Sequence, residues 1–386
     1  MKKFNKVVSA VMTSALALTM LAGCGSGAAS GSDTFKIGAI GPLTGAAAAY
    51  GNAVVNGAQI AVDEINAAGG IGGVKIEYKG EDDELNAEKS VNAYNTLKDW
   101  GMQILVGSTT SACSIAVSEN TKADNMFQLT PSGSAEDCVK YDNVFRVCFS
   151  DPNQGIASAQ YINDHNLATK VGIIYDSSDV YSSGIYQKFA QESEGKNYEI
   201  VSAEAYTQDN NTDFSVQLQK AKDAGADLVF LPIYYSDAAL ILTQANTMGY
   251  APTFFGVDGM DGILTVENFD TSLAEGLMLL TPFAADATDD LTVNFVKKYN
   301  EKYGETPNQF AADAYDAVYI IKAAIEKSGV TPDMSVSDIG TKLTEAMTQI
   351  EASGLTSSKM TWSASGEPNK EPKAVVIKDG AYVTAE

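Results

Sequence analysis

The most constraining feature of this chain is an alternation of short apolar segments with amphipathic ones, which begins at Phe35. Residues 35–40 form an apolar run. In 54–65 the apolar side chains recur at helical spacing before the chain reaches Gly69 and Gly70. A period of about 3.6 residues indicates a helix, and glycine often follows the last turn of one. Strands that alternate with helices imply mostly parallel sheets covered by helices on both faces.

The alternation runs in two blocks, which predicts an α/β protein with two doubly wound, mostly parallel lobes. In the first block, strands are expected at 74–78, 104–106 and 126–129, and helices at 85–100 and 114–124. In the second, strands are expected at 171–175, 200–205, 228–231 and 253–255, and helices at 154–163, 181–194, 214–224 and 238–248. The last part is expected to hold helices at 291–303, 311–327 and 339–351 and a hairpin of 359–362 with 374–377.

The N-terminus predicts export. Three lysines precede an apolar run over 7–21 that is rich in Ala, Ser and Thr. This run is shorter and less apolar than the ~20 residues of a spanning helix, so it indicates a secretory signal peptide. Residues 21–24 (Leu-Ala-Gly-Cys) resemble a bacterial lipobox, which implies removal of 1–23 and acylation of Cys24. Residues 24–33 then form a flexible, lipid-anchored linker, and we expect the protein on the extracytoplasmic face of the cell membrane.

The charge of the chain excludes one class of partner. Removing residues 1–23 takes away three lysines and no acid, so the formal charge moves from −23 to −26. A surface of that sign repels nucleic acid and anionic lipid headgroups. We therefore expect no nucleic-acid binding, and a membrane contact through the N-terminal lipid only.

The scarcity of histidine removes several kinds of chemistry. His165 is the single histidine, and it is expected at the exposed end of a helix. A histidine-rich zinc site or a Ser/His/Asp triad is therefore excluded, and we expect no metal ion and no cofactor. Beyond Cys24 the chain has Cys113, Cys138 and Cys148. Export permits a Cys138–Cys148 disulfide, and the sequence leaves that pairing open.

Polar residues that could form a site follow the predicted strands, in loops 40–45, 107–111, 130–134 and 255–259. Ligands of parallel α/β sheets bind beyond the carboxyl ends of the strands. Ser111 begins a helix, where hydroxyl and backbone N–H groups can hold a carboxylate. Asp258 is the natural partner for an ammonium. These groups fit an α-amino acid, and its side chain would need apolar walls, for which the candidates are Tyr50, Tyr181, Tyr234 and Phe310.

Each candidate also has a purely structural interpretation. Ser111 would be only a helix cap, because serine is favoured there. Asp258 would form an Asx-turn between glycines, and Ser132 and Ser134 would serve turn geometry alone. The aromatic residues would be core or hinge packing.

The whole mature chain resembles the leucine/isoleucine/valine-binding proteins of ABC importers, which have the type I periplasmic binding fold. The segments that carry the resemblance are 36–45 with Tyr50-Gly51, 57–58, 63–71, 106–108, 130–132, Phe145-Arg146, 151–155 and 314–317. The resemblance implies two lobes joined by a multi-strand hinge. The first lobe would comprise 34–152 and 283–358, and the second 153–282 and 359–386.

The binding positions of that family map onto this sequence one by one. Its carboxylate-binding serine matches Ser111, and its ammonium-binding acid matches Asp258, where leucine-type proteins more often have Glu. The other matched positions are the contact loop Ser132, Gly133 and Ser134 and the pocket aromatics Tyr50, Tyr181, Tyr234 and Phe310. Thr109 and Thr110 stand where leucine binders tend to have apolar wall residues. Together with the shorter Asp258, they leave open a smaller or more polar amino acid than leucine.

The resemblance implies a monomeric solute-binding lipoprotein that captures a branched-chain or similar small amino acid and delivers it to ABC permease subunits. Two alternatives keep the same fold. One binds an amide, a urea-like compound or an aromatic acid, and the other acts as a sensor. An enzyme is not expected, because Gly38, Gly41 and Gly45 have the wrong spacing for a dinucleotide site and no phosphate loop is present.

Overall fold

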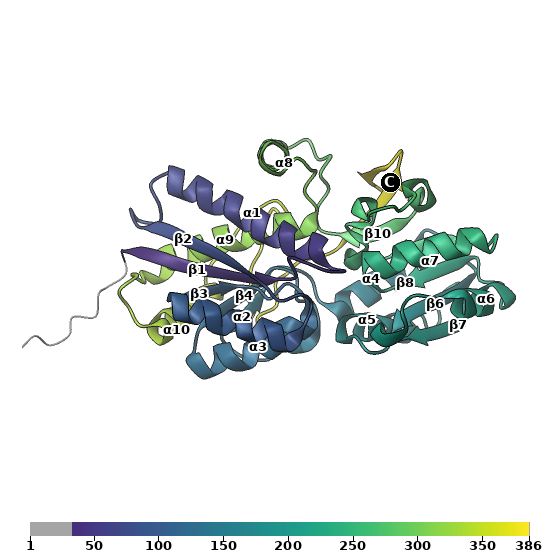
Figure 1. Cartoon of the computed structure of the whole chain (residues 1–386), viewed down its shortest axis with the longest axis horizontal. Coiled ribbons are helices and arrows are strands. Elements are labelled where there is room, and N and C mark those ends of the chain that lie inside the picture. Colours follow the sequence, from purple (N-terminus) through teal and green to yellow (C-terminus); the bar gives the residue numbers. More distant parts are fainter. Residues whose placement is uncertain (1–32, 386) are drawn as a thin grey trace, which may run out of the picture. The chain divides into compact units, whose positions relative to one another are not determined.

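The computed structural model describes residues 33–385, so the predicted signal peptide, Cys24 and nearly all of the linker lie outside the described residues. Two sheets covered by helices account for most of the described chain (Figure 1), which confirms the predicted fold class. Among residues 33–385, no helix combines the length and apolar character that crossing a bilayer requires.

The first sheet has five strands, all parallel, in the order β2-β1-β3-β4-β5. Its strands are β1 Thr34–Gly41, β2 Lys75–Asp82, β3 Ile104–Val106, β4 Phe127–Thr130 and β5 Val144–Arg146. The helices beside it are α1 Ala48–Ala67, α2 Ala87–Trp100, α3 Ser111–Asp124, α8 Asp290–Tyr303, α9 Gln309–Ser328 and α10 Val336–Met347. Figure 1 shows α1 and α9 on one face and α2 and α3 on the other. We call this part the first lobe.

The second sheet has seven strands in the order β12-β11-β10-β9-β8-β6-β7. Its strands are β6 Lys170–Asp176, β7 Glu199–Tyr206, β8 Leu228–Leu231, β9 Thr253–Gly256, β10 Met278–Thr281, β11 Lys373–Lys378 and β12 Ala381–Thr384. Its helices are α4 Asp151–Asp164, α5 Val180–Glu192, α6 Ser215–Asp223 and α7 Tyr235–Thr247. Strands β6 to β10 are parallel, whereas β11 runs antiparallel to both of its neighbours. We call this part the second lobe.

The predicted hairpin near the C-terminus is wrong. Strand β11 pairs with β10 and β12, and the segment before it forms only isolated bridges, Ala352 with Met360 and Trp362 with Pro368. The reason is that β10, which the sequence pattern did not reveal, offers β11 an edge to pair with. The lobe boundaries proposed at 152, 282 and 358 stay predictions.

Buried polar contacts tie the C-terminal segment to the first lobe before it enters the second sheet. The Trp362 indole donates to the Arg146 carbonyl at 2.8 Å. The Lys370 ammonium contacts Asp313 at 2.5 Å, with both side chains at most 2% exposed. A buried charge is tolerated only when it is paired in this way. The segment is therefore fixed at a defined point where it passes from one lobe to the other.

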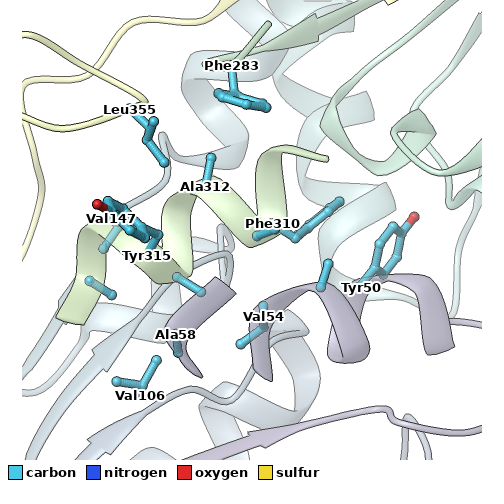
Figure 2. Close-up of a cluster of buried hydrophobic side chains, with 14 of the residues drawn as sticks. Tyr50, Val54, Ala58, Val106, Val147, Phe283, Phe310, Ala312, Tyr315 and Leu355 are labelled. Carbon is cyan, nitrogen blue, oxygen red and sulfur yellow. The ribbon is translucent and has the colours of Figure 1, made fainter. Parts of the chain in front are cut away.

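Helices α1 and α9 pack closely together, which positions two aromatic side chains of the predicted site. A Cβ added to Gly57 would lie 2.0 Å from the carbonyl oxygen of Ala311, so only glycine allows this approach. Figure 2 shows Val54 of α1 within the cluster between the two helices, with Tyr50 and Phe310 at its end. The packing of α1 on α9 therefore holds these two rings beside each other.

Candidate functional site

A cavity lies where the carboxyl ends of strands from both sheets meet, as the position of ligand sites in parallel α/β proteins predicts. The residues that line it are Tyr50, Thr109, Thr110, Ser111, Ser132, Tyr181, Tyr234, Asp258, Gly259 and Phe310. Seven of the nine predicted ligand-binding positions are thus brought together, and both lobes contribute. The other two, Gly133 and Ser134, are not among the lining residues.

The two lobes close tightly around this cavity. The free volume of the cavity is about 10 Å³, roughly the room of one water molecule. The side chains that line it are therefore nearly in contact and must move apart to admit a larger ligand.

The N-terminus of α3 forms one end of the cavity. Its cap residue Thr110 makes no capping bond through its side chain, and the buried Thr110 hydroxyl has no partner within residues 33–385. The Ser111 hydroxyl oxygen accepts bonds from the backbone N–H groups of Ser134 and Ala135, each at 3.2 Å. Its acceptor positions are filled, so its proton is free to be donated. A helix N-terminus with free donors attracts an anion.

The neighbouring loop offers acceptors as well as donors. The Ser132 hydroxyl donates to the Thr109 carbonyl at 2.6 Å, which leaves its oxygen able to accept a further bond. The Arg146 guanidinium, which is fully buried, donates to the Gly133 and Ser134 carbonyls. These contacts hold the backbone carbonyls of Gly133 and Ser134, which are buried and do not line the cavity.

Asp258 forms the opposite end of the cavity, on the 3₁₀ helix η3, Asp258–Met260. Its carboxylate accepts from the Tyr181 hydroxyl at 2.6 Å, and its backbone N–H donates to Gln154 at 3.2 Å. The Tyr181 oxygen in turn accepts from the Gly259 N–H at 2.9 Å. Burial raises the pKa of Asp258 to about 7, although the bond from the Tyr181 hydroxyl opposes this shift. A cation beside Asp258 would restore its charge.

The aromatic residues form a continuous wall that spans both lobes. The ring of Tyr50 lies 4.3 Å from that of Phe310 and 5.4 Å from that of Tyr234, measured between centroids. Tyr181 stacks on Tyr234 at 5.0 Å. Burial raises the pKa of all three tyrosines well above the usual value, so they stay neutral and can donate hydrogen bonds.

A second buried acid, Asp151, was missed by the sequence reasoning. It is 1% exposed, and neither carboxylate oxygen has a hydrogen-bond partner among the described residues. Burial raises its pKa well above the usual value, and the charge of Asp258 raises it further. Asp151 begins α4, which is the next element after β5, and so follows the carboxyl end of a strand. That position was the signal that could have revealed it.

Other reactive groups of the described chain do not form a competing site. Within residues 33–385, no group of three or more histidine, cysteine or acidic side chains is arranged to hold a metal ion. His165 is exposed just after α4 and bonds to the Tyr161 carbonyl, which confirms the predicted helix-end position. Cys113, Cys138 and Cys148 are free and buried, so the pairing left open by the sequence is not formed. Burial raises the pKa of Cys113 to about 12, which makes it a poor nucleophile.

Comparisons with known proteins agree with this geometry. A family described as periplasmic binding protein matches residues 34–381. The chain is 32% identical over 292 residues to the Leu/Ile/Val-binding protein BraC3 of Rhizobium johnstonii, covering 75% of this chain and 78% of that one. It is 26% identical to a leucine-, isoleucine-, valine-, threonine- and alanine-binding protein of Pseudomonas aeruginosa, covering 76% and 78%.

A solved structure is similar over nearly the whole described body. The isoleucine complex of the branched-chain amino acid transporter substrate-binding protein LivJ from Streptococcus pneumoniae superposes with a TM-score of 0.83. It is 29% identical, and the match covers 92% of this chain and 99% of that one.

Proposed function

Because the chain belongs to the periplasmic binding protein family, we propose that it captures a small α-amino acid between its lobes and delivers it to an ABC importer. The observation that carries this proposal is the polarity of the cavity. Hydroxyl and helix N–H donors face it from the first lobe, and an acid faces it from the second. Such an arrangement complements a zwitterion whose two ends lie a few ångströms apart. No bond is made or broken in this function.

The carboxylate of the ligand would bind at the N-terminus of α3. Ser111 has a hydroxyl proton to donate, because its oxygen already accepts two backbone bonds. The neighbouring Thr110 hydroxyl is buried and has no partner in the part of the chain that the structure describes. The first N–H groups of the helix add donors and a favourable dipole.

The ammonium of the ligand would bind on the other side of the cavity. Asp258 supplies a carboxylate, and the Ser132 oxygen can accept a further bond. Asp151 is a second buried acid near this side of the cavity, and burial together with the charge of Asp258 raises its pKa well above the usual value. An ammonium beside Asp258 would favour its ionised form and recover part of the cost of burying that charge.

The side chain of the ligand would lie against the aromatic wall. The tight cavity and the hydroxyls of Thr109 and Thr110 favour a small or moderately polar side chain. The relative from Pseudomonas aeruginosa is named for binding threonine and alanine beside the branched-chain amino acids. We therefore place alanine, threonine and valine among the ligands to test first.

A thermal-shift screen of the twenty amino acids tests the proposal on protein freed of carried-over ligand by unfolding and refolding. A ligand present at 100 times its Kd should stabilise the native state by about 2.7 kcal/mol. The same screen on Asp258→Asn serves as the control, and the response should be lost there. If amides or aromatic acids shift the transition and no amino acid does, the proposal is refuted.

One observation favours a second candidate function. A pKa of about 7 allows Asp258 to be neutral under physiological conditions and to donate a hydrogen bond. A neutral amide, a urea-like compound or an aromatic acid would suit that form of the site. Such a ligand would bind Asp258→Asn about as well as the unaltered protein, because the asparagine amide can also donate.

We also propose that the protein is a monomeric lipoprotein, anchored to the membrane through acylated Cys24 on the extracytoplasmic face. The lipobox-like residues 21–24 support the lipid anchor. The predicted lobe boundaries fit a hinge in which binding to one lobe is completed by contacts from the other.

A further inference from the structure

Helices α1 and α7 lie on opposite sides of the cleft, and a tyrosine hydroxyl from each caps the N-terminus of the other outside the ligand cavity. Helix α1 belongs to the first lobe, and its cap residue Ala47 makes no capping bond through its side chain. The Tyr235 hydroxyl, from the first residue of α7 in the second lobe, accepts the N–H of Ala49 at 3.2 Å. In return, the Tyr50 hydroxyl of α1 accepts the N–H of Tyr235 at 3.3 Å. Each helix therefore satisfies an N–H group that the other cannot satisfy within itself.

The same contact includes close packing of the two rings. Tyr50 and Tyr235 meet edge to face, with centroids 4.9 Å apart and planes at 83°. Both side chains are largely buried, Tyr50 at 1% and Tyr235 at 6% exposure. The Tyr50 hydroxyl also donates to the Gly259 carbonyl of η3. The contact thus joins α1 to two elements of the second lobe.

The two tyrosines differ in their relation to the cavity. Tyr50 lines it, whereas Tyr235 is not among its lining residues. A change at Tyr235 therefore acts on the contact between the lobes without removing a wall of the cavity. This separation allows the closing of the cleft to be tested apart from ligand contact.

We propose that Tyr235 is an affinity-determining residue that acts by stabilising the closed arrangement of the lobes and not by touching the ligand. The inference rests on the proposed function, because it assumes that a ligand is held between the lobes. Separating α1 from α7 exposes the Ala49 N–H to water, which satisfies it. The hydroxyl of Tyr235 is therefore needed only when the cleft is closed. A smaller closed fraction raises the apparent Kd in proportion.

Tyr235→Phe tests the inference, because it removes this acceptor and keeps the ring. Loss of one neutral hydrogen bond should raise the Kd of the amino acid found in the screen about two- to tenfold. The rise should appear in the dissociation rate, with the association rate little changed. Isothermal titration and stopped-flow measurements give these quantities.

Tyr250→Phe is the matched control. Tyr250 is also a nearly buried tyrosine, at 9% exposure, and its hydroxyl donates to the Ala226 carbonyl at 3.0 Å within the second lobe. This variant should lower the melting temperature and leave the Kd and the dissociation rate unchanged. An unchanged Kd in Tyr235→Phe, or an equal rise in both variants, would overturn the inference.

A measurement without any ligand separates failure of this inference from failure of the proposed function. Spin labels on Glu88→Cys in α2 and Val216→Cys in α6, in protein that carries Cys24→Ser, report the distance between the lobes, because Cys113, Cys138 and Cys148 are buried. Tyr235→Phe should shift that distance distribution toward longer separations, and Tyr250→Phe should not. If this shift is seen but the unaltered protein binds no amino acid, the proposed ligand is wrong and the role of Tyr235 in closure stands. If no shift is seen, the inference is wrong.

Discussion

Amino acid affinity should rise with pH between 6 and 8, because Asp258 must be ionised to pair with an ammonium. Burial raises the pKa of Asp258 to about 7 in the folded protein, against an ordinary value near 3.9. The ligand therefore competes with a proton for this carboxylate. Protonated Asp258 offers no charge to the ammonium, and the site is left with an unpaired cation.

The magnitude follows from the fraction of ionised Asp258. With a pKa of about 7, roughly a tenth of the carboxyl groups are ionised at pH 6 and roughly nine tenths at pH 8. The Kd should therefore fall about tenfold across this interval if binding requires the ionised form. At pH 7, each binding event should release about half a proton, because half of the groups must lose theirs.

The effect on the stability of the unliganded protein has the opposite sign. The pKa of Asp258 is raised on folding, so the native state binds the proton more tightly than the unfolded state does. The stabilisation of the native state that Asp258 provides in this way is fully present below about pH 3.9 and is lost as the pH rises through about 7. As the pH rises from 6 to 8, the affinity for the amino acid should thus increase while the unliganded protein becomes less stable.

Isothermal titration at pH 6, 7 and 8, in buffers of different ionisation enthalpy, measures both the Kd and the proton release. Asp261→Asn and Asp179→Asn are required as comparisons, because burial also raises the pKa of Asp261 to about 7 and that of Asp179 to about 6. The pH dependence that persists in both variants belongs to Asp258. If the Kd is the same at pH 6 and pH 8 and no proton is released, Asp258 is not the partner of the ammonium.

Two further predictions concern packing and anchoring. Gly57→Ala should destabilise the protein by roughly 1–3 kcal/mol, because its Cβ would meet the Ala311 carbonyl and separate α1 from α9. Thermal unfolding should show a transition several degrees lower, and an unchanged transition would contradict the packing argument. Cys24→Ser should prevent acylation and leave the protein in the soluble fraction of an expressing cell. Membrane retention of this variant would refute the lipid anchor.

Local sequence patterns, such as apolar periodicity and glycines at helix ends, predicted most elements of the first sheet and its helices. Gly69 and Gly70 follow α1, and short apolar runs such as 104–106 are strands in the structure. These signals lie within a few residues of the element that they define. The positions of Ser111 and Asp258 in one cavity followed from a general rule, since both stand after the carboxyl ends of parallel strands.

The features that were missed depend on contacts between distant residues. Strand β10 has only four residues and follows an irregular segment, so no periodicity reveals it. Strand β11 pairs with it across about ninety residues of sequence, which is why the local hairpin was preferred. The Asp151-Pro152 dipeptide looks like an ordinary helix start, and the burial of its carboxylate depends on the packing of other elements. The contact of Tyr235 with Ala49 joins positions 186 residues apart and has no local signature.

The short helix η3 joins ligand binding to closure of the cleft. Its Asp258 carboxylate faces the cavity, while the Asp258 carbonyl accepts from the Gln309 side chain of α9 at 2.7 Å. The next residue, Gly259, accepts from Tyr50 of α1 through its carbonyl and donates to Tyr181 through its N–H. A ligand that draws Asp258 into the cavity therefore acts on the same backbone that holds α1 and α9. Substitutions in η3 should consequently change affinity and closure together, whereas Ser111→Ala should lower affinity and leave the closed fraction of the unliganded protein unchanged.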